Sequence, residues 1–218
     1  MSITFKDLQA KVTAWSHRTD LAAQIPDFCN IGLQELELNY NFRGMLKKAP
    51  ALAVTANSAW VTPPTDYKEL APSWFVDATG KRWPLTKDSE RHSVGLYPDY
   101  VNDADTIPQT IAYAQNSAGA WMFLLRPTPN VAGTIDLSYY AKSPDLVADG
   151  DTNYILNGDW SLLLFAALVS LSEYIDDAAG FTKWSGHREA LAQKIIASET
   201  KEKFAGSYQS VKSGYVIE

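Results

Sequence analysis

His92 has the most chemically useful neighbours in this sequence, because Asp88, Ser89 and Glu90 all lie within four positions of it. A histidine near a serine and a carboxylate is the raw material of a serine hydrolase. The spacing nevertheless matches no nucleophile elbow or other catalytic motif. The other two histidines, at positions 17 and 187, have no partner at metal-ligand spacing. A hydrolase is therefore the least favoured function for this chain.

A calcium loop is the second chemistry that residue spacing suggests. Asp149, Asp151 and Asn153 alternate as in the opening of an EF-hand loop, which needs glycine at position six and glutamate at position twelve. Those positions hold Tyr154 and Trp160. We therefore expect no metal or cofactor here, and a polar connection whose side chains cap turns and the following helix.

Cys29, the single cysteine, lies beside Phe28 and Ile31, which predicts a buried small side chain and no disulfide within the chain. Phosphate-binding loops, dinucleotide fingerprints, zinc-protease motifs and paired cysteines do not occur in the sequence. The residues thus favour a structural or interaction protein over an enzyme.

Composition narrows the class further. The chain has 218 residues, 46% of them hydrophobic, and a net charge of −6, so it has no bulk positive field for nucleic acid or an anionic bilayer. The first residues lack the pattern of a signal peptide, and the apolar run Trp160 to Ile175 is too short to span a membrane. We expect synthesis in a cytoplasm.

Helical spacing occurs at both ends of the sequence. The first helix is predicted from Phe5 to His17, with Thr4 and Asp7 as a capping box, and the second from about Pro26 to Gly44. The apolar run from Trp160, capped by Asp159, should end near residues 178–180, and a last helix should cover about 181–205. The buried side of the second helix is predicted to include Phe28, Ile31, Glu35, Leu38 and Phe42, and to be broadened by Leu33, Leu36 and Tyr40. That of the last helix is predicted to include Trp184, Ala190, Leu191, Ile195 and Ile196.

Between the helices the period changes to two, and nine of the eleven prolines lie between Pro63 and Pro144. Short strands are predicted at 51–55, 59–62, 70–76, 81–86, 110–114, 121–125 and 134–141. We expect an α+β fold, a helical bundle formed by N- and C-terminal helices with an inserted β-rich domain. Residues 1–44 and 158–205 would form the bundle, 45–157 the insertion and 206–218 a C-terminal tail.

Charge is unevenly distributed along the chain. Seven acids and no lysine or arginine lie between Ser143 and Thr182, whereas Arg43, Lys47 and Lys48 cluster after the second helix. Ordinary solvated faces would explain this pattern. The functional alternative is that Asp149 and Asp151 meet the basic cluster of a neighbouring subunit and set the register of a ring.

Several segments occur in an order that is typical of one family. They are residues 15–21 (WSHRTDL) with 25–28 (IPDF), 61–70 (VTPPTDYKEL), 124–129 (LLRPTP), 138–142 (SYYAK), 152–156 (TNYIL), and Trp184. Together they resemble the tailed-phage head-to-tail adaptor, or connector, proteins. The resemblance runs from about residue 6 to residue 200, except for residues 83–100, and leaves the last thirteen residues unmatched.

The resemblance implies a non-enzymatic virion component at the head–tail junction. Such adaptors form a ring, commonly of twelve copies, beneath the portal protein, extend its DNA channel and dock the tail or nozzle protein. DNA would pass without specific binding, and no membrane is involved. The bundle would supply lateral ring contacts, and the β-rich insertion would face the tail proteins or the outside.

The resemblance also gives the unmatched tail and the acids a role. We expect residues 206–218 to fold onto the portal through five apolar anchors, Tyr208, Val211, Tyr215, Val216 and Ile217. As an alternative to subunit contacts, Asp149 and Asp151 would line the channel and repel DNA. A competing function is a carbohydrate- or receptor-binding virion protein, with Trp74, Trp83 and Trp121 as aromatic platforms.

Overall fold

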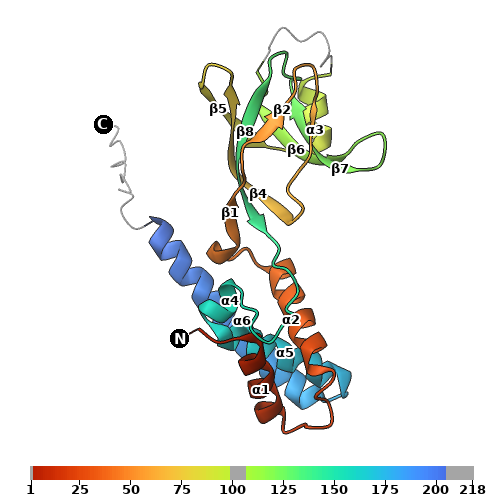
Figure 1. The fold of residues 1–218 in the computed structure, drawn as a ribbon, viewed down its shortest axis with the longest axis vertical. Coiled ribbons are helices and arrows are strands. Elements are labelled where there is room, and N and C mark those ends of the chain that lie inside the picture. Colours follow the sequence, from red (N-terminus) through yellow and green to blue (C-terminus); the bar gives the residue numbers. More distant parts are fainter. Residues whose placement is uncertain (1, 99–106, 205–218) are drawn as a thin grey trace, which may run out of the picture. The chain divides into compact units, whose positions relative to one another are not determined.

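The computed structural model describes residues 2–98 and 107–204 and is mixed α+β. Residue contacts divide the chain into two compact units, Met1–Arg43 with Leu146–Glu218, and Gly44–Asp145. We call the first the helical unit and the second the sheet unit, and each is described by itself. Figure 1 shows that the helical unit joins the two ends of the chain.

The helical unit is built around one apolar helix. Its elements are α1 (Phe5–Ser16), α2 (Ile25–Asn39), α4 (Tyr154–Asn157), α5 (Trp160–Tyr174) and α6 (Ala178–Phe204). α5 contacts each of the other four, which explains why its apolar residues run nearly all round the helix (Figure 1). No helix in the described ranges is long and apolar enough to cross a membrane.

A capping box sets the start of α1. A glycine allows α2 and α5 to pack closely against each other. The predicted capping box is confirmed, because Thr4 and Asp7 bond reciprocally to each other's backbone N–H. At Gly32 of α2, an added Cβ would lie 2.8 Å from the backbone carbon of Ala166. A side chain at this position would therefore push the two helices apart.

The predicted end of the second helix was wrong. α2 ends at Asn39, five residues before Gly44, because Tyr40 turns to an extended conformation and its N–H closes the last turn on Leu36. The turn brings Phe42 into the core, where its ring packs 6.3 Å from that of Tyr154. The predicted buried side was also partly wrong, since Ile31 and Leu38 are 46% and 77% exposed.

The junction of the last two helices was also misplaced. α5 ends at Tyr174, and the predicted stop at residues 178–180 is instead the start of α6. Asp176 adopts a left-handed conformation (φ 60°), and the Asp177 carboxylate accepts a hydrogen bond from Gly180 N–H, which caps α6. Among residues 178–201 of α6, Ala192 is the fully buried one, whereas the predicted Ala190 is exposed.

The sheet unit holds an eight-stranded sheet with the order β1-β8-β4-β5-β6-β7-β3, and β2 also pairs with β8. Its strands are β1 (Leu46–Lys48), β2 (Leu52–Val54), β3 (Trp60–Val61), β4 (Tyr67–Asp77), β5 (Arg82–Lys87), β6 (Thr110–Gln115), β7 (Trp121–Arg126) and β8 (Gly133–Ala141). The predicted hairpins β4–β5 and β6–β7 are confirmed. β1 and the helix α3 (Glu90–Leu96) were not predicted, because both are short.

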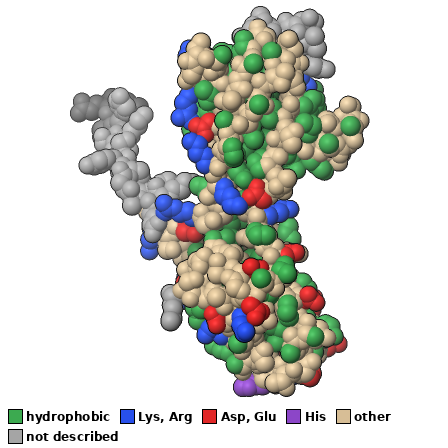
Figure 2. Space-filling model, viewed as in Figure 1, with side chains coloured by type: hydrophobic (Ala, Val, Ile, Leu, Met, Phe, Trp, Pro, Cys, Tyr) green, Lys and Arg blue, Asp and Glu red, His purple; other side chains and the backbone are tan. Residues whose placement is uncertain are grey.

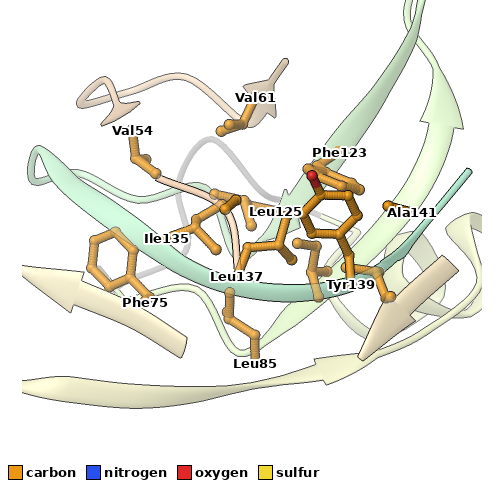
Figure 3. Packing of buried hydrophobic residues seen from close by; sticks show 13 residues of the cluster. Val54, Val61, Phe75, Leu85, Phe123, Leu125, Ile135, Leu137, Tyr139 and Ala141 are labelled. Atoms are coloured by element: carbon orange, nitrogen blue, oxygen red, sulfur yellow. The ribbon is translucent and has the colours of Figure 1, made fainter. Parts of the chain in front are cut away.

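The core of the sheet unit follows the alternation of β8. Ile135, Leu137 and Tyr139 are buried, and the residues between them face outward, as the period of two predicts. Figure 3 shows these side chains meeting Phe123 and Leu125 of β7. Tyr67 joins the cluster from β4, with its ring 4.9 Å from that of Phe123. Strands that are not neighbours in the hydrogen-bonded order thus share one core.

Candidate interaction surfaces

The exposed side of α2 carries apolar residues that no described element covers. Ile31 and Leu38 lie seven positions apart on this side. Tyr174, 61% exposed, packs against Phe28 of α2, while Val147, 82% exposed, follows a residue bonded to Asn30. We call these four exposed residues, Ile31 and Leu38 on α2 with Val147 and Tyr174 on segments that contact α2, the α2 patch. Figure 2 shows apolar and acidic side chains intermixed on the surface of the helical unit.

A second surface lies where α1, α5 and α6 meet. The ring of Trp15 packs 6.0 Å from Phe165 and 5.8 Å from Trp184. Beside these rings opens a cavity of about 340 Å³, whose lining includes Leu168 and Lys183. Trp15 is 47% exposed, so an aromatic side chain lies at the surface beside a hollow that is lined by both apolar and polar residues, among them Ser172 and Asp177.

The sheet unit carries a row of aromatic rings that runs from the surface inward. The half-exposed ring of Trp121 stacks 5.2 Å from that of Tyr113, and the ring of Tyr113 lies 4.7 Å from that of Tyr67. Trp74 and Trp83, the other predicted platforms, have cations against their rings, Arg82 at 5.2 Å and Lys81 at 3.8 Å. Of the three predicted tryptophans, Trp121 is therefore the one that stacks on an exposed aromatic neighbour.

The basic residues predicted for subunit contacts have partners of their own. Lys47 Nζ lies 2.8 Å from Asp66, and Lys48 Nζ lies 3.2 Å from Asp136, which also binds Arg82. Arg43 belongs to the helical unit, where its backbone N–H donates to the Glu199 carboxylate at 2.9 Å. The sequence cluster is thus shared between the two units.

Asp66 connects Lys47 of β1 to the core of the sheet unit. It accepts a hydrogen bond from the Tyr139 hydroxyl at 2.8 Å as well as the ion pair with Lys47. Burial opposes ionisation of Asp66, but the bonds from Lys47 and Tyr139 outweigh it and hold the pKa below its usual range. Burial, and then the bond to Asp66, raises the pKa of Tyr139 to about 12.

Asp149 and Asp151, the acids predicted to meet the basic residues of a neighbouring subunit, also have partners within the chain. Asp151 accepts hydrogen bonds from the backbone N–H groups of Val147 and Ala148, both at 2.8 Å, which lowers its pKa. Asp149 lies 3.2 Å from Lys6. Asn153 caps α4, as expected of a polar connection, while Asp159 stands at the start of α5 without a side-chain bond. Among the described residues, no group of three metal-ligating side chains comes together.

The residues near His92 hold α3 in place. His92 Nδ1 lies 2.7 Å from Asp88, and the bond to His92 lowers the pKa of that carboxyl. The Ser89 hydroxyl accepts from the backbone N–H of His92 and so caps the helix. Ser93, which is fully buried, lies 2.9 Å from the Thr110 hydroxyl on β6. These side chains therefore have structural partners.

Cys29 is fully buried, as predicted, and burial raises the pKa of its thiol to about 12. The five tail anchors, Tyr208, Val211, Tyr215, Val216 and Ile217, lie outside the described residues. Sequence reasoning missed the α2 patch, because it assigned Ile31 and Leu38 to the core. The prediction placed both apolar stripes of the helix on one buried face, although the second stripe, with Leu33 and Leu36, is the buried one.

Comparison with known families identifies one match along the chain. The family model described as SU10 adaptor protein matches residues 3–210. This range includes all of the elements described above in both units. No curated protein matches the chain.

Proposed function

Because the chain belongs to the SU10 adaptor protein family, a family of phage head-to-tail adaptors, we propose that it is a structural virion protein of the head–tail junction. In this proposal it forms a ring of about twelve copies beneath the portal. The ring extends the DNA channel and docks the tail or nozzle protein. The observation that carries the proposal is the family match over residues 3–210.

The α2 patch supports lateral contacts by the helical unit, which we take as a helical bundle with the sheet unit inserted. Protein interfaces are enriched in aromatic residues and depleted of charge at their centre. The patch combines Tyr174 with three aliphatic side chains, all exposed in the single chain. The sheet unit would then present its aromatic row, from Trp121 to Tyr67, toward the tail.

Imaging and mass measurement of the purified chain, alone and with the portal, test the proposal. We expect a ring, or a ring that forms only on the portal. A chain that stays monomeric and does not bind the portal would overturn the proposal.

The tail and the charged residues have narrower proposed roles. We propose that residues 206–218 anchor the chain to the portal through the five apolar residues of this segment. Deletion of 206–218 should leave a folded chain that no longer binds the portal. Unchanged binding would remove this role from the tail.

For the charges, we propose that Arg43, Lys47 and Lys48 meet Asp149 and Asp151 of a neighbouring subunit, or that the two acids line the channel. The side chains of Lys47, Lys48 and Asp149 are each more than half exposed, so a neighbouring subunit could reach them. Asp149→Lys tests both roles without removing the backbone bonds of Asp151. Weaker ring assembly supports the subunit contact, and slower DNA passage through intact rings supports the channel.

A carbohydrate- or receptor-binding role is the second candidate, and the exposed stack of Trp121 on Tyr113 favours it. A glycan array with the full chain and with Trp121→Ala tests it. Glycan binding that the variant loses would support this role, and the absence of binding by the unaltered chain would dismiss it.

A further inference from the structure

The exposed side of α6 carries a row of lysines. Ala192 is fully buried and marks the side of α6 that packs on the rest of the unit. The residues on the opposite side of the helix recur at spacings of three, four and seven. They are Lys183, Ala190, Lys194, Ala197 and Lys201, and all five are exposed, whereas the ring of His187 stacks 5.4 Å from that of Phe165 on α5. We call these five exposed residues the α6 ridge. From Lys183 to Lys201 it extends about 27 Å at the rise of an α-helix.

The α6 ridge is basic, although the chain as a whole carries a net charge of −6. The ridge contains three lysines and no acid. Glu189 and Glu199 of the same helix turn toward the body of the unit, where they accept hydrogen bonds from Tyr40 and from the backbone of Arg43. The lysines therefore lie on the exposed side of α6, and Glu189 and Glu199 turn toward the rest of the unit.

The lysines of the ridge have little compensation inside the chain. Within the described ranges, Lys194 and Lys201 form no ion pair, and Lys183 Nζ lies 4.1 Å above the ring of Trp184. An uncompensated basic stripe along a helix is the electrostatic footprint of a polyanion-binding surface.

Composition distinguishes the ridge from a protein-binding surface. Lysine and alanine, which make up all five of its residues, are depleted in protein interfaces, while aromatic residues and arginine are enriched. The α2 patch of the same unit has the opposite character, with Tyr174 and aliphatic side chains. The ridge lacks apolar anchors and depends on charge alone.

We propose that the α6 ridge faces the channel and contacts the sugar–phosphate backbone of double-stranded DNA, so that Asp149 and Asp151 take the subunit contact and not the channel. This inference rests on the proposed ring around DNA. Lysine is a hydrated point charge, whereas arginine grips phosphate with two hydrogen bonds. Three spaced lysines per copy give a weak contact that does not depend on sequence, along which DNA can slide.

Salt-dependent DNA binding tests the inference. The triple variant Lys183→Gln, Lys194→Gln and Lys201→Gln is compared with a matched variant of the sheet unit, Lys81→Gln, Lys87→Gln and Lys142→Gln. Each variant has three fewer positive charges than the unaltered protein. Affinity for linear duplex DNA of mixed sequence is measured over a range of salt, with the ring on its portal and with the free chain.

We expect the ridge variant to bind DNA about tenfold or more weakly at low salt. Its salt slope should fall by about 0.9 for each phosphate that the ridge no longer neutralises, while the sheet-unit variant stays near the unaltered protein. Arginine at the same three positions should restore both the affinity and the slope.

Equal slopes in the ridge variant and the unaltered protein would overturn the inference. So would a ridge variant that fails to bind the portal while its affinity for DNA is unchanged, because the ridge would then contact protein. If the unaltered chain forms no ring, the ring proposal fails separately, and the titration of the free chain still decides whether the ridge binds DNA.

Discussion

The side chain of Asn30 and the backbone of Leu146 exchange two hydrogen bonds across 116 positions of sequence. The Asn30 amide donates to the Leu146 carbonyl at 3.0 Å, and the Leu146 N–H donates to the Asn30 oxygen at 2.8 Å. Leu146 is the first residue of the chain's return to the helical unit. One amide of α2 thus fixes the start of the returning segment, and with it the position of Val147 in the α2 patch.

Asn30→Ala should lower the free energy of unfolding by about 1–3 kcal/mol, because it leaves two backbone groups of a buried residue without partners. Urea unfolding measures the change. Asn39→Ala is the matched control, since Asn39 donates to the carbonyl of Glu35 in an exposed position. Equal losses in both variants would show that the bond to Leu146 adds nothing specific.

Gly32→Ala should destabilise the protein by about 1–3 kcal/mol, because its Cβ would lie 2.8 Å from the backbone of Ala166. Alanine is the better helix former by about 1 kcal/mol, so propensity alone predicts the opposite sign. At Gly186 of α6 an added Cβ meets nothing within 4 Å, and Gly186→Ala should raise the stability by up to about 1 kcal/mol. Thermal unfolding of the two variants separates close packing from propensity.

Acid should weaken the sheet unit through Asp66. The pKa of Asp66 is depressed in the folded state, so its contribution is present above the unfolded carboxyl pKa of about 3.9 and is lost as the pH falls through the folded value. Asp66→Asn should therefore be less stable than the unaltered protein at pH 6, with the difference shrinking below about pH 4. Denaturant unfolding at several pH values checks this. A difference that is constant with pH would exclude ionisation of Asp66 as the cause.

Replacing Ile31 and Leu38 together by serine should change the free energy of unfolding by about 0.5 kcal/mol or less, because both side chains are exposed. The same variant should fail to assemble into rings on the portal. Leu33→Ala, at a buried position of α2, should instead cost about 2–5 kcal/mol. Ring assembly by the double variant at the normal level would exclude the α2 patch from the lateral contact.

Cys29 should resist alkylation in the native protein at pH 8, because burial both blocks access and raises the pKa of the thiol to about 12. Labelling should become fast once denaturant unfolds the helical unit. Mass spectrometry after a short exposure to iodoacetamide provides the measurement. Rapid labelling of the folded chain would show that α2 opens locally.

Local patterns predicted the hairpins and the first helix well. The turn Asp77–Gly80 and the capping box of Thr4 depend on bonds between residues within four positions of each other, which the sequence displays directly. The end of α2 could not be predicted in the same way. Tyr40 leaves the helix where Phe42 packs against Tyr154, a residue more than a hundred positions away.

The surfaces proposed for function were the least predictable part. Both apolar stripes of α2 have helical spacing, and only the packing of α2 on α5 shows that Leu33 is buried while Ile31 is exposed. The α6 ridge was hidden for a similar reason, because lysines and acids alternate in that sequence and separate only when the helix is placed against its neighbours.

The sequence by itself determined the residue types, the hairpins, the apolar central helix and the base-free stretch of seven acids. Tertiary structure decided how those acids are used. Asp149 and Asp151 lie before α5, and Glu173, Asp176 and Asp177 at or after its end, separated by fifteen residues of helix or about 22 Å. A stretch that is continuous in sequence is therefore two groups in space. Charge is a property of the residue, but the field that a partner meets depends on where the fold places it.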